Sequence, residues 1–332
     1  MRPVNISTSA PTRIDLAGGT IDIWPLYLFH PGAQTLNAAI SLRATARIAT
    51  RSDDLIVIQS EDTSTTVEAA RWQDLRNERT LRLLSLLVHF FEGHGITLTT
   101  NSASPAGAGI AGSSALNVAV CAALADWRRT HYEPEALLQI AMNIEAQAIN
   151  VPTGLQDYRP ALYGGIAAIE LEVDGVRRVP LDVDLKELQR RIVLCYTGEP
   201  RHSGTNNWEI TKRHVDGDRH TFDCFERIRD TAATMRTALT RGDWDGVSAA
   251  IGEEWANRKR LSPGVTTPAI ERLIARTAQA GATAAKVCGA GGGGCLFCYG
   301  PPERRGDIAE ALAAGGATIL DYRFEQHGLL RG

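Results

Sequence analysis

The sequence of 332 residues lacks the features that mark membrane, secreted and nucleic-acid-binding proteins. Its longest apolar runs, such as 110–125, are broken by Gly, Ser and Asn and fall short of the roughly 20 apolar residues that a membrane span needs. No apolar stretch near the first residue resembles a secretory signal. The formal net charge is −3, whereas a nucleic-acid binder usually has a basic domain with clustered cations. We therefore expect a cytoplasmic monomer or homodimer with no membrane or nucleic-acid partner.

Disulfide and metal-binding patterns are also missing. The six cysteines are scattered, and scattered cysteines in so long a chain do not predict a disulfide framework. Cys295 and Cys298 form a lone CxxC in an apolar run typical of a buried strand, where residues three apart point to opposite faces. A zinc site would need a second such pair. We predict that these two thiols pack in the core, and the eight histidines form no metal-binding motif.

Strand and helix patterns mix throughout the chain, which predicts two α+β domains. We expect strands at 38–50, 55–60, 96–100, 163–173, 192–198, 284–288, 295–299 and 317–324. We expect helices at 82–91, 114–130, 135–150, 221–241, 243–257, 268–280 and 304–314. The composition becomes polar and charged near 180–190, so we place the domains at 1–185 and 186–332.

The loop between the strand at 96–100 and the helix at 114–130 is a candidate anion site. A helix start presents about four unpaired N–H groups and roughly half a positive charge. Glycines let the backbone wrap an anion without obstruction by Cβ, and serine hydroxyls can reach a phosphate-bound Mg²⁺. An ordinary loop capped by Ser113 is the alternative. The combination favours a triphosphate cradle built from Pro105, Gly107, Gly109, Gly112, Ser113 and Ser114.

This loop departs from three standard motifs, each at a definable position. Residues 107–112 satisfy the dinucleotide fingerprint GxGxxG, but the nearest later acid, Asp126, lies inside the predicted helix and not at the end of a second parallel strand. A Walker A motif needs Lys-Ser/Thr where the chain has Ser113 and Ser114, and neither serine has the glycine that a nucleophile elbow requires after it. An NAD(P)-dependent oxidoreductase using Gly107–Gly112 is the alternative function.

A second glycine-rich segment, 286–295, joins two predicted strands. A hairpin turn with positive φ is one interpretation. Five glycines in six positions exceed what a turn requires and favour a backbone that lies close to a ligand. Gly289, Gly291 and Gly292 are thus candidate cofactor-binding residues. Lys286, one of only four lysines, is either a phosphate contact or a solvated side chain.

Two carboxylates near the end of the helix at 135–150 suit phosphoryl transfer. That reaction needs positioning, charge neutralisation and one group that accepts or orients the proton of the acceptor hydroxyl. Asp157, in the turn at 152–160, is a candidate, and a structural ion pair with Arg159 is an equal alternative. Glu145 is a candidate Mg²⁺ ligand because hard cations prefer carboxylate oxygen. From its spacing alone, an exposed helical glutamate is the simpler interpretation.

Together these residues resemble the GHMP kinases, a family named for galactokinase, homoserine kinase, mevalonate kinase and phosphomevalonate kinase. Residues 10–22 (APTRIDLAGGTID) resemble the first family motif, 105–115 resemble the phosphate loop PxxxGLGSSA, and 286–294 resemble the third, glycine-rich motif. The resemblance is strongest to the sugar-1-kinase branch, which includes the D-glycero-D-manno-heptose 7-phosphate kinases and the galactokinase-like sugar kinases. It extends through 154–165, 194–204 and 253–274, so it spans almost the whole chain.

The resemblance implies an ATP- and Mg²⁺-dependent kinase that acts on a hydroxyl, the anomeric one, of a sugar or sugar phosphate such as a heptose 7-phosphate. It implies that Asp157 and Arg13 are catalytic and that Ser113 and Glu145 bind the metal. The implied substrate contacts are Asp22, Gly19, Asp157 and Arg159. A cation near a carboxylate favours its ionised form, which is the role implied for Arg13. A non-catalytic sugar-binding relative is a further alternative.

The resemblance also implies a fold. The N-terminal domain is expected to contain a left-handed βαβ unit, against the usual right-handed rule, and the C-terminal domain to be a ferredoxin-like α+β unit. The active site would lie in the cleft between them. Residues 110–112 are Ile-Ala-Gly where the family usually has Leu-Gly-Ser, so Ser113 and Ser114 both stay candidates for the metal-binding serine. Residues 158–160 are Tyr-Arg-Pro where Gln-Tyr-Ala is common.

Overall fold

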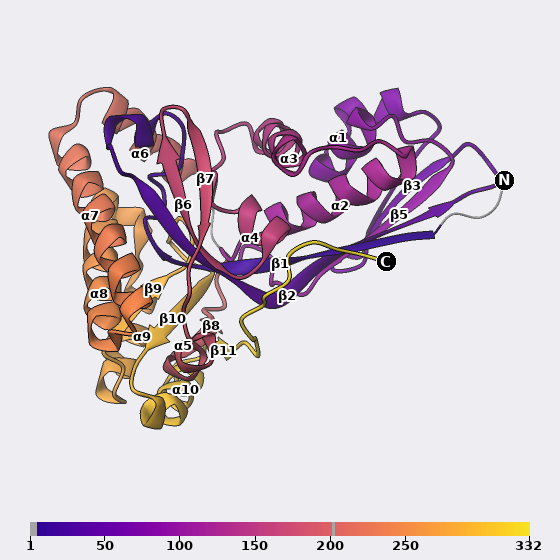
Figure 1. Cartoon of the computed structure of the whole chain (residues 1–332). Coiled ribbons are helices and arrows are strands. Elements are labelled where there is room, and N and C mark those ends of the chain that lie inside the picture. Colours follow the sequence, from indigo (N-terminus) through magenta and orange to yellow (C-terminus); the bar gives the residue numbers. More distant parts are fainter. Residues whose placement is uncertain (1–4, 201–202) are drawn as a thin grey trace.

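A mixed eight-stranded sheet organises the first half of the chain in the computed structural model, which describes residues 5–200 and 203–332. Its strands are β1 (Asn5–Ala17), β2 (Gln34–Thr50), β3 (Ile56–Ser60), β4 (Thr65–Ala69), β5 (Ile96–Ser102), β6 (Ile166–Glu172), β7 (Gly175–Pro180) and β12 (Leu330–Arg331). The strand order is β12-β1-β2-β5-β3-β4, and the β6–β7 hairpin pairs with the first part of β2. The long antiparallel pair of β1 and β2 runs through the length of this half (Figure 1).

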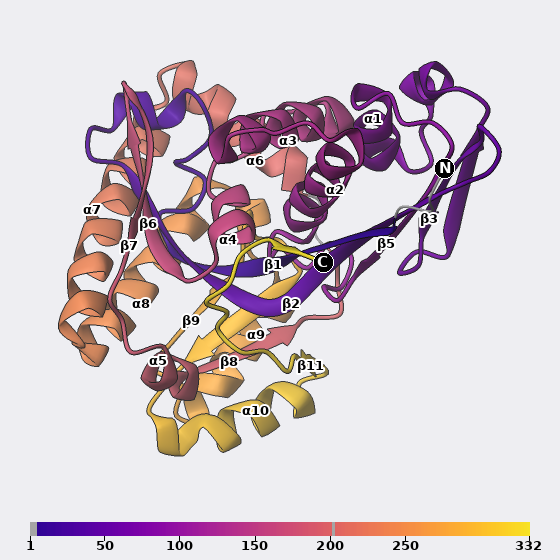
Figure 2. The ribbon, with the colours of Figure 1, turned by 45° about the vertical axis from the view of Figure 1, so that its right-hand side comes forward.

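Four α-helices lie on one face of this sheet (Figures 1 and 2). They are α1 (Arg82–Phe90), α2 (Gly112–Arg128), α3 (Pro134–Ile149) and α4 (Tyr158–Tyr163), with 3₁₀ turns at η1 (Leu26–Phe29) and η2 (Trp72–Asn77). Helix α2 is apolar on nearly all sides and is therefore central: it contacts β1, β2, α1, α3 and α4. Strands β3 and β5 pair in parallel through a connection that includes α1, and a parallel pair requires such a crossover.

An antiparallel sheet in the order β11-β8-β10-β9 organises the second half. Its strands are β8 (Ile192–Tyr196), β9 (Ala284–Val287), β10 (Cys295–Tyr299) and β11 (Thr318–Ile319). The helices are α5 (Leu185–Arg191), α6 (Ser203–Val215), α7 (Arg219–Arg241), α8 (Trp244–Leu261), α9 (Pro268–Gln279) and α10 (Arg305–Ala314), with 3₁₀ turns at η3 (Pro263–Val265) and η4 (Pro302–Arg304). A strand, helices, a β-hairpin, a helix and a final strand give the ferredoxin-like βαββαβ order.

The two halves share an apolar core. Residues of β1 and β2 pack in one cluster with residues of α7, α8, β8 and β10; among them are Ile14, Leu36, Ile251, Leu194 and Phe297. A separate cluster fills the space between the second sheet and α9 and α10. Cys295 belongs to the shared cluster and Cys298 to the separate one, so the two thiols point to opposite faces of β10 and both pack in a core, as predicted. All six cysteines are buried.

Most predicted elements are present, but several observed ones were not predicted. The strands β1, β4, β7 and β12 were not expected, residues 158–163 form α4 where a turn was predicted, and the polar stretch at 185–191 forms α5. The strand predicted at 317–324 contains only β11, because the chain then leaves the second sheet: the Ser41 N–H donates to Arg323 O, and Phe324 bridges to Ile40. The predicted domain boundary falls at the first residue of α5. Arg201 and His202, within the segment 194–204 of the family resemblance, lie outside the described residues.

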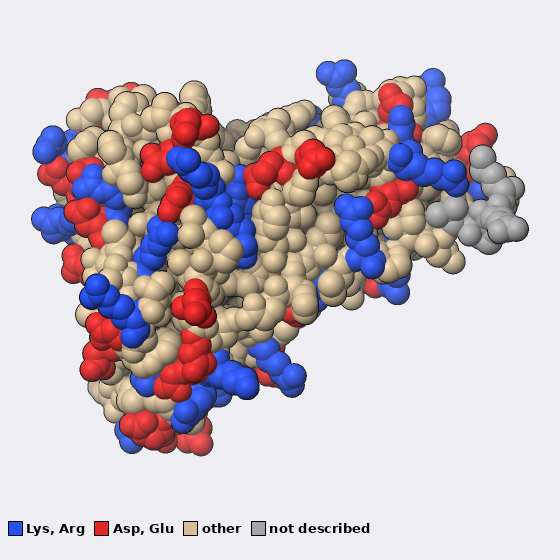
Figure 3. All heavy atoms as spheres, in the orientation of Figure 1, with Lys and Arg blue, Asp and Glu red and all other residues tan. Residues whose placement is uncertain are grey.

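Acidic and basic side chains are interspersed on the face shown in Figure 3. None of the helices in the described part of the chain combines the length and the apolar character needed to cross a bilayer.

Candidate active site

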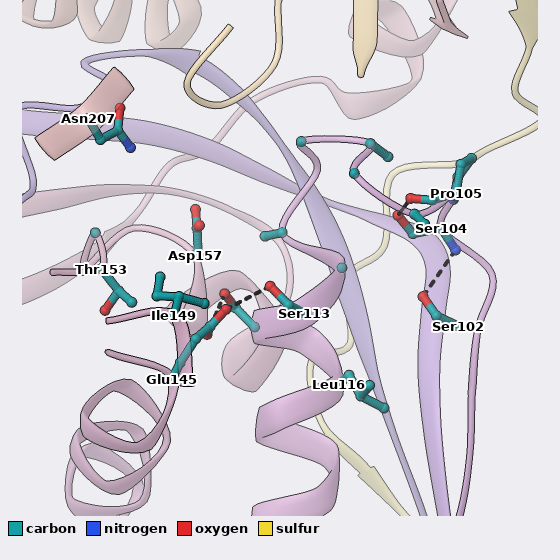
Figure 4. A pocket seen from close by; sticks show the side chains of 18 of the residues that line it. Ser102, Ser104, Pro105, Ser113, Leu116, Glu145, Ile149, Thr153, Asp157 and Asn207 are labelled. Carbon is teal, nitrogen blue, oxygen red and sulfur yellow. Dashed lines mark hydrogen bonds between the residues drawn. The ribbon is translucent and has the colours of Figure 1, made fainter. Parts of the chain in front are cut away.

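The glycine loop and the carboxylate at 157 border one cavity of about 320 Å³. Its wall combines the segment after β5, the start of α2, the end of α3 with the following segment, and Asn207 of α6 (Figure 4). Among its lining residues are the predicted Pro105, Gly107, Gly109, Gly112, Ser113, Ser114, Glu145 and Asp157. In Figure 4, Asp157 points into the cavity beside Ser113 and Glu145. The structure therefore brings the predicted glycine loop and the two candidate carboxylates, Glu145 and Asp157, to one cavity.

The backbone of the loop is shaped to leave the start of α2 open. Gly107 and Gly109 adopt positive φ, at 68° and 78°, a conformation that glycine takes without steric cost. Ala111, the N-cap of α2, is also left-handed at φ 61°, and no side chain in the described residues caps the helix. Ser113 thus lies in the first helical turn, and the alternative in which it caps an ordinary loop is wrong. The first N–H groups of α2 are available to a bound anion.

Glu145 is buried, so the interpretation as an exposed helical glutamate is wrong. Its Oε1 accepts a hydrogen bond from the Ser113 hydroxyl at 2.6 Å, and its Oε2 accepts from Ser114 at 3.0 Å and from the Tyr158 hydroxyl at 2.7 Å. Burial raises the pKa of Glu145 above its usual range, the charge of Asp157 adds to this, and the hydroxyl donors oppose it. Burial, with the charge of Glu145, also raises the pKa of Tyr158, which therefore keeps its proton and donates.

Arg13 of β1 joins the loop to the carboxylate. Its Nη2 lies 2.5 Å from Asp157 Oδ1, and its Nη1 donates to Gly109 O at 2.9 Å. Burial by itself would lower the pKa of Arg13, but the charges of Asp157 and Asp15 outweigh this effect and raise it. The guanidinium is 1% exposed, whereas the Asp157 side chain is 24% exposed toward the cavity. Asp157 is therefore paired with Arg13 and not with its neighbour Arg159.

Arg159 lies away from the cavity. Its Nη2 is 2.5 Å from Glu135 Oε2 of α3, and its Nη1 donates to Leu155 O at 3.1 Å. The side chain is buried and is not among the residues that line the cavity. Arg159 is thus occupied by a structural ion pair with Glu135, and the structure does not support the substrate contact that the family resemblance implies.

Asp22 is a buried carboxylate close to Asp157. Its Oδ2 accepts a hydrogen bond from the Gln156 N–H at 2.9 Å, and Gly154 packs so closely against it that a Cβ there would overlap the carboxylate. Its Oδ1 has no hydrogen-bond partner among the described residues. Burial and the charge of Asp157 raise the pKa of Asp22 to about 6, against the opposing Gln156 N–H. Asp22 is 1% exposed and is not among the residues that line the cavity, so its unpartnered Oδ1 is what marks it as a place for a hydroxyl donor.

A buried charge cluster lies behind Arg13. Lys286 is fully buried, and its Nζ lies 2.7 Å from Asp15 Oδ2 and 3.8 Å from Glu254 Oε1. Both sequence interpretations of Lys286, the phosphate contact and the solvated lysine, are therefore wrong. Burial would raise the pKa of Asp15, but Lys286 and Arg13 lower it to about 2. Arg258 of α8 adds bonds to the Thr20 hydroxyl and to the Gly289 carbonyl.

Sequence reasoning missed the other members of this cluster. Asp15 lies inside the first motif, while Glu254 and Arg258 lie in the segment 253–274 that carries the family resemblance, so these segments were the available signal. Gly19 packs against this cluster as well: a Cβ there would lie 2.6 Å from Arg258 Nη1.

The second glycine loop supports the first. The Cys295 N–H donates to Ala108 O at 2.6 Å, and a Cβ at Gly294 would lie 2.6 Å from the same oxygen. The Gly289 N–H donates to Asp15 Oδ1 at 2.8 Å, and the Gly292 N–H donates to Val265 O at 2.8 Å. The predicted cofactor-binding glycines, Gly289, Gly291 and Gly292, are not among the residues that line the cavity.

Several polar residues of the cavity wall gave no signal in the sequence. They are Asp62, Ser102, Ser104, Thr153 and Asn207. Asn207 has a buried Oδ1 with no hydrogen-bond partner within the described part of the chain. Isolated polar residues of this kind are common on surfaces, so only their position on the cavity marks them. Within residues 5–200 and 203–332, no group of three or more His, Cys, Asp and Glu side chains is arranged to hold a metal.

Comparison with known proteins places this geometry in a family. Residues 78–165 match the model of the GHMP kinase N-terminal domain, and residues 235–318 match that of the GHMP kinase C-terminal domain. The chain is 29% identical to a D-glycero-alpha-D-manno-heptose 7-phosphate kinase of Campylobacter jejuni, over 98% of each chain. It is 24% identical to a bifunctional fucokinase/GDP-fucose pyrophosphorylase of Arabidopsis thaliana, over 98% of this chain and 32% of that one.

A solved structure shows the same fold over its whole length. A crystal structure described as a putative sugar kinase from Campylobacter jejuni superposes with a TM-score of 0.80 and 26% identity, and the match covers 99% of this chain and 98% of that one. Both domain models match in the expected order, and the cavity is lined by residues of the phosphate-loop motif at 105–115. The chain belongs to the GHMP kinase family.

Proposed function

We propose that this protein transfers the γ-phosphoryl group of ATP to a hydroxyl of a sugar or sugar phosphate. The observation that carries the proposal is the bridge made by Arg13, whose guanidinium bonds both to Gly109 O of the glycine loop and to Asp157. One rigid, buried cation thereby sets the distance between an anion cradle and a carboxylate that faces the same cavity. Phosphoryl transfer depends on that positioning more than on covalent chemistry.

The residues of the cavity have distinct tasks in this reaction. The N–H groups at the start of α2 and the loop backbone at Gly107 and Gly109 bind the phosphates. Asp157 accepts or orients the proton of the acceptor hydroxyl, and the ion pair with Arg13 holds that carboxylate in position. The same guanidinium stabilises negative charge that develops in the transition state.

The pair of Ser113 and Glu145 fits Mg²⁺. Their oxygens lie 2.6 Å apart on the cavity wall, and both are hard donors. Mg²⁺ usually takes one or two protein carboxylates together with phosphate oxygens and water, so a larger protein cage is not required. When bound, the ion neutralises phosphate charge. Ser113 and Glu145 would hold it at the start of α2.

Asp22 supports a polyhydroxylated acceptor. Its free Oδ1 is buried next to Asp157, where it accepts a hydrogen bond from a sugar hydroxyl beside the one that reacts. The relatives named above act on a heptose 7-phosphate and on fucose, judged by their names. We propose the anomeric hydroxyl of a sugar or sugar phosphate of this size as the acceptor and, since ATP is the donor, a cytoplasmic reaction.

The two alternative functions fit the site less well. The acid that a dinucleotide site would need, Asp126, lies in α2 and pairs with Arg331 at 2.6 Å. A non-catalytic sugar-binding relative would not need Arg13, Asp157 and Glu145 assembled on one cavity.

Turnover with a panel of acceptors tests the proposal. ADP release is measured with MgATP and D-glycero-D-manno-heptose 7-phosphate, fucose, galactose or mannose, and ³¹P NMR identifies the phosphorylated position. We expect one acceptor to be preferred and Asp157→Asn to lose at least about 100-fold in turnover, while MgADP still raises its melting temperature. Asp126→Asn serves as the control and should keep full activity. Near-wild-type turnover of Asp157→Asn, or no acceptor-dependent ADP release, would contradict the proposal.

A further inference from the structure

The two oxygens of Glu145 have different surroundings. Oε1 has one donor, the Ser113 hydroxyl at the cavity wall. Oε2 has two donors, the hydroxyls of Ser114 and Tyr158, at 3.0 and 2.7 Å. Ser114 is 3% and Tyr158 1% exposed, so these two bonds are made away from solvent.

This asymmetry determines which oxygen can bind a cation. An ionised carboxylate offers about two lone-pair sites on each oxygen. Two hydroxyl donors saturate Oε2, whereas Oε1 keeps one site in addition to the bond from Ser113. The carboxylate is held by donors from two helices, α2 and α4, so it cannot rotate to exchange its oxygens without breaking two buried hydrogen bonds. A cation in the cavity therefore meets Oε1.

Tyr158 also connects Glu145, the proposed metal ligand, to Asp157, the proposed catalytic residue. It is the first residue of α4 and directly follows Asp157, the N-cap of that helix. Its buried hydroxyl donates its hydrogen bond to Glu145, so Tyr158 acts through that carboxylate and not on the substrate. The family resemblance gives no guide here, because a glutamine is common at this position.

We propose that Tyr158 is a positioning residue which, together with Ser114, fixes Glu145 so that Oε1 and the Ser113 hydroxyl form the Mg²⁺-binding pair. Ser114 then holds the carboxylate through Oε2, the oxygen that does not bind the metal in this proposal. This inference rests on the proposed function, since it concerns the cation of the proposed kinase reaction.

Metal binding, measured separately from turnover, tests the proposal. Mn²⁺ replaces Mg²⁺, and its dissociation constant in the presence of ADP is measured by EPR for each variant. We expect Tyr158→Phe to bind Mn²⁺ about 10- to 100-fold more weakly, the usual effect of removing a residue that orients a metal ligand. ADP affinity without metal should stay unchanged. Ser114→Ala should resemble Tyr158→Phe, and Ser113→Ala should bind Mn²⁺ at least as weakly as either.

Tyr163→Phe is a matched control. Tyr163 lies on the same short helix, and its hydroxyl also donates to a glutamate, Glu135 Oε1 at 3.0 Å, outside the residues that line the cavity. It should bind Mn²⁺ as the wild type does. An unchanged Mn²⁺ affinity in Tyr158→Phe, or an equal loss in Tyr163→Phe, would overturn the inference.

The outcomes separate the two proposals. If the wild type binds no nucleotide, the proposed function fails. If it binds Mn²⁺ with ADP and Tyr158→Phe binds both equally well, only the positioning role fails. Circular dichroism checks folding, and if Tyr158→Phe does not fold, Ser114→Ala decides: unchanged Mn²⁺ affinity in that variant overturns the inference.

Discussion

Replacing Asp22 by asparagine should make the protein more stable while weakening its proposed activity. The substitution keeps the shape of the side chain, and an amide oxygen can still accept the bond from the Gln156 N–H. What it removes is an ionised group in a buried position beside Asp157. Burial and that neighbouring charge raise the pKa of Asp22 from its ordinary 3.8 to about 6, while Gln156 and Arg13 act in the opposite direction.

The sign of the stability change follows from this direction. An acid whose pKa is raised by folding binds its proton more tightly in the folded state. The free energy of unfolding is therefore highest below the ordinary pKa of Asp22, and it falls as the pH rises to about 6. Above that value the cost of the ionised carboxylate is constant, up to about 3 kcal/mol, and near pH 5 it is about half as large. Asparagine avoids this cost at every pH.

Urea denaturation followed by circular dichroism near pH 5 and near pH 8 tests this reasoning. We expect Asp22→Asn to gain up to about 3 kcal/mol near pH 8 and roughly half of that near pH 5. The KM for the sugar should rise at least about 10-fold, because a hydrogen bond to a charged acceptor is lost. The exposed Asp54→Asn serves as the control and should show no gain. A gain that does not depend on pH, or a loss of stability near pH 8, would refute the assignment.

Three further substitutions test the structure around the cavity. Lys286→Met leaves its buried carboxylate partner without its main cation and should cost about 3–5 kcal/mol in urea denaturation; a loss below about 1 kcal/mol, as for an exposed pair, would contradict the burial. Gly294→Ala forces a Cβ at φ 79° against Ala108 O and should weaken nucleotide binding measured by calorimetry, whereas Gly252→Ala, with open space around it on α8, should not. Arg159→Met should leave the sugar KM unchanged and lower stability by about 1 kcal/mol; a KM that rises instead would return Arg159 to the substrate site.

Elements with a strong local pattern were predictable. Helix α2 follows from its dense run of small apolar residues, and the glycine loop before it follows from residues that permit positive φ. The strand β10 and the opposite orientations of Cys295 and Cys298 follow from the two-residue period of a strand. The short helix α4 was missed, because its six residues lie between a turn and a strand and include a proline.

The partners of charged residues were not predictable in the same way. Asp157 has a cation two residues away in sequence, yet it pairs with Arg13, which is 144 residues away. Lys286 lies next to a glycine loop that suggests phosphate, yet it is buried against Asp15, 271 residues away. Local spacing contains no information about which distant side chains share a buried space, and it is burial without water that makes such pairs obligatory.

By itself, the sequence indicated the glycine loop as a candidate anion site, the candidate carboxylates and the family to which they point, because glycine conformation, helix starts and strand periodicity depend on neighbouring residues. Only the tertiary structure decided that Arg13 connects the cradle to Asp157, that Glu145 is buried under three hydroxyl donors and that Arg159 faces α3. These outcomes depend on packing between β1, α2, α3 and α4. In such a buried setting a charge is stable only where a distant partner compensates it.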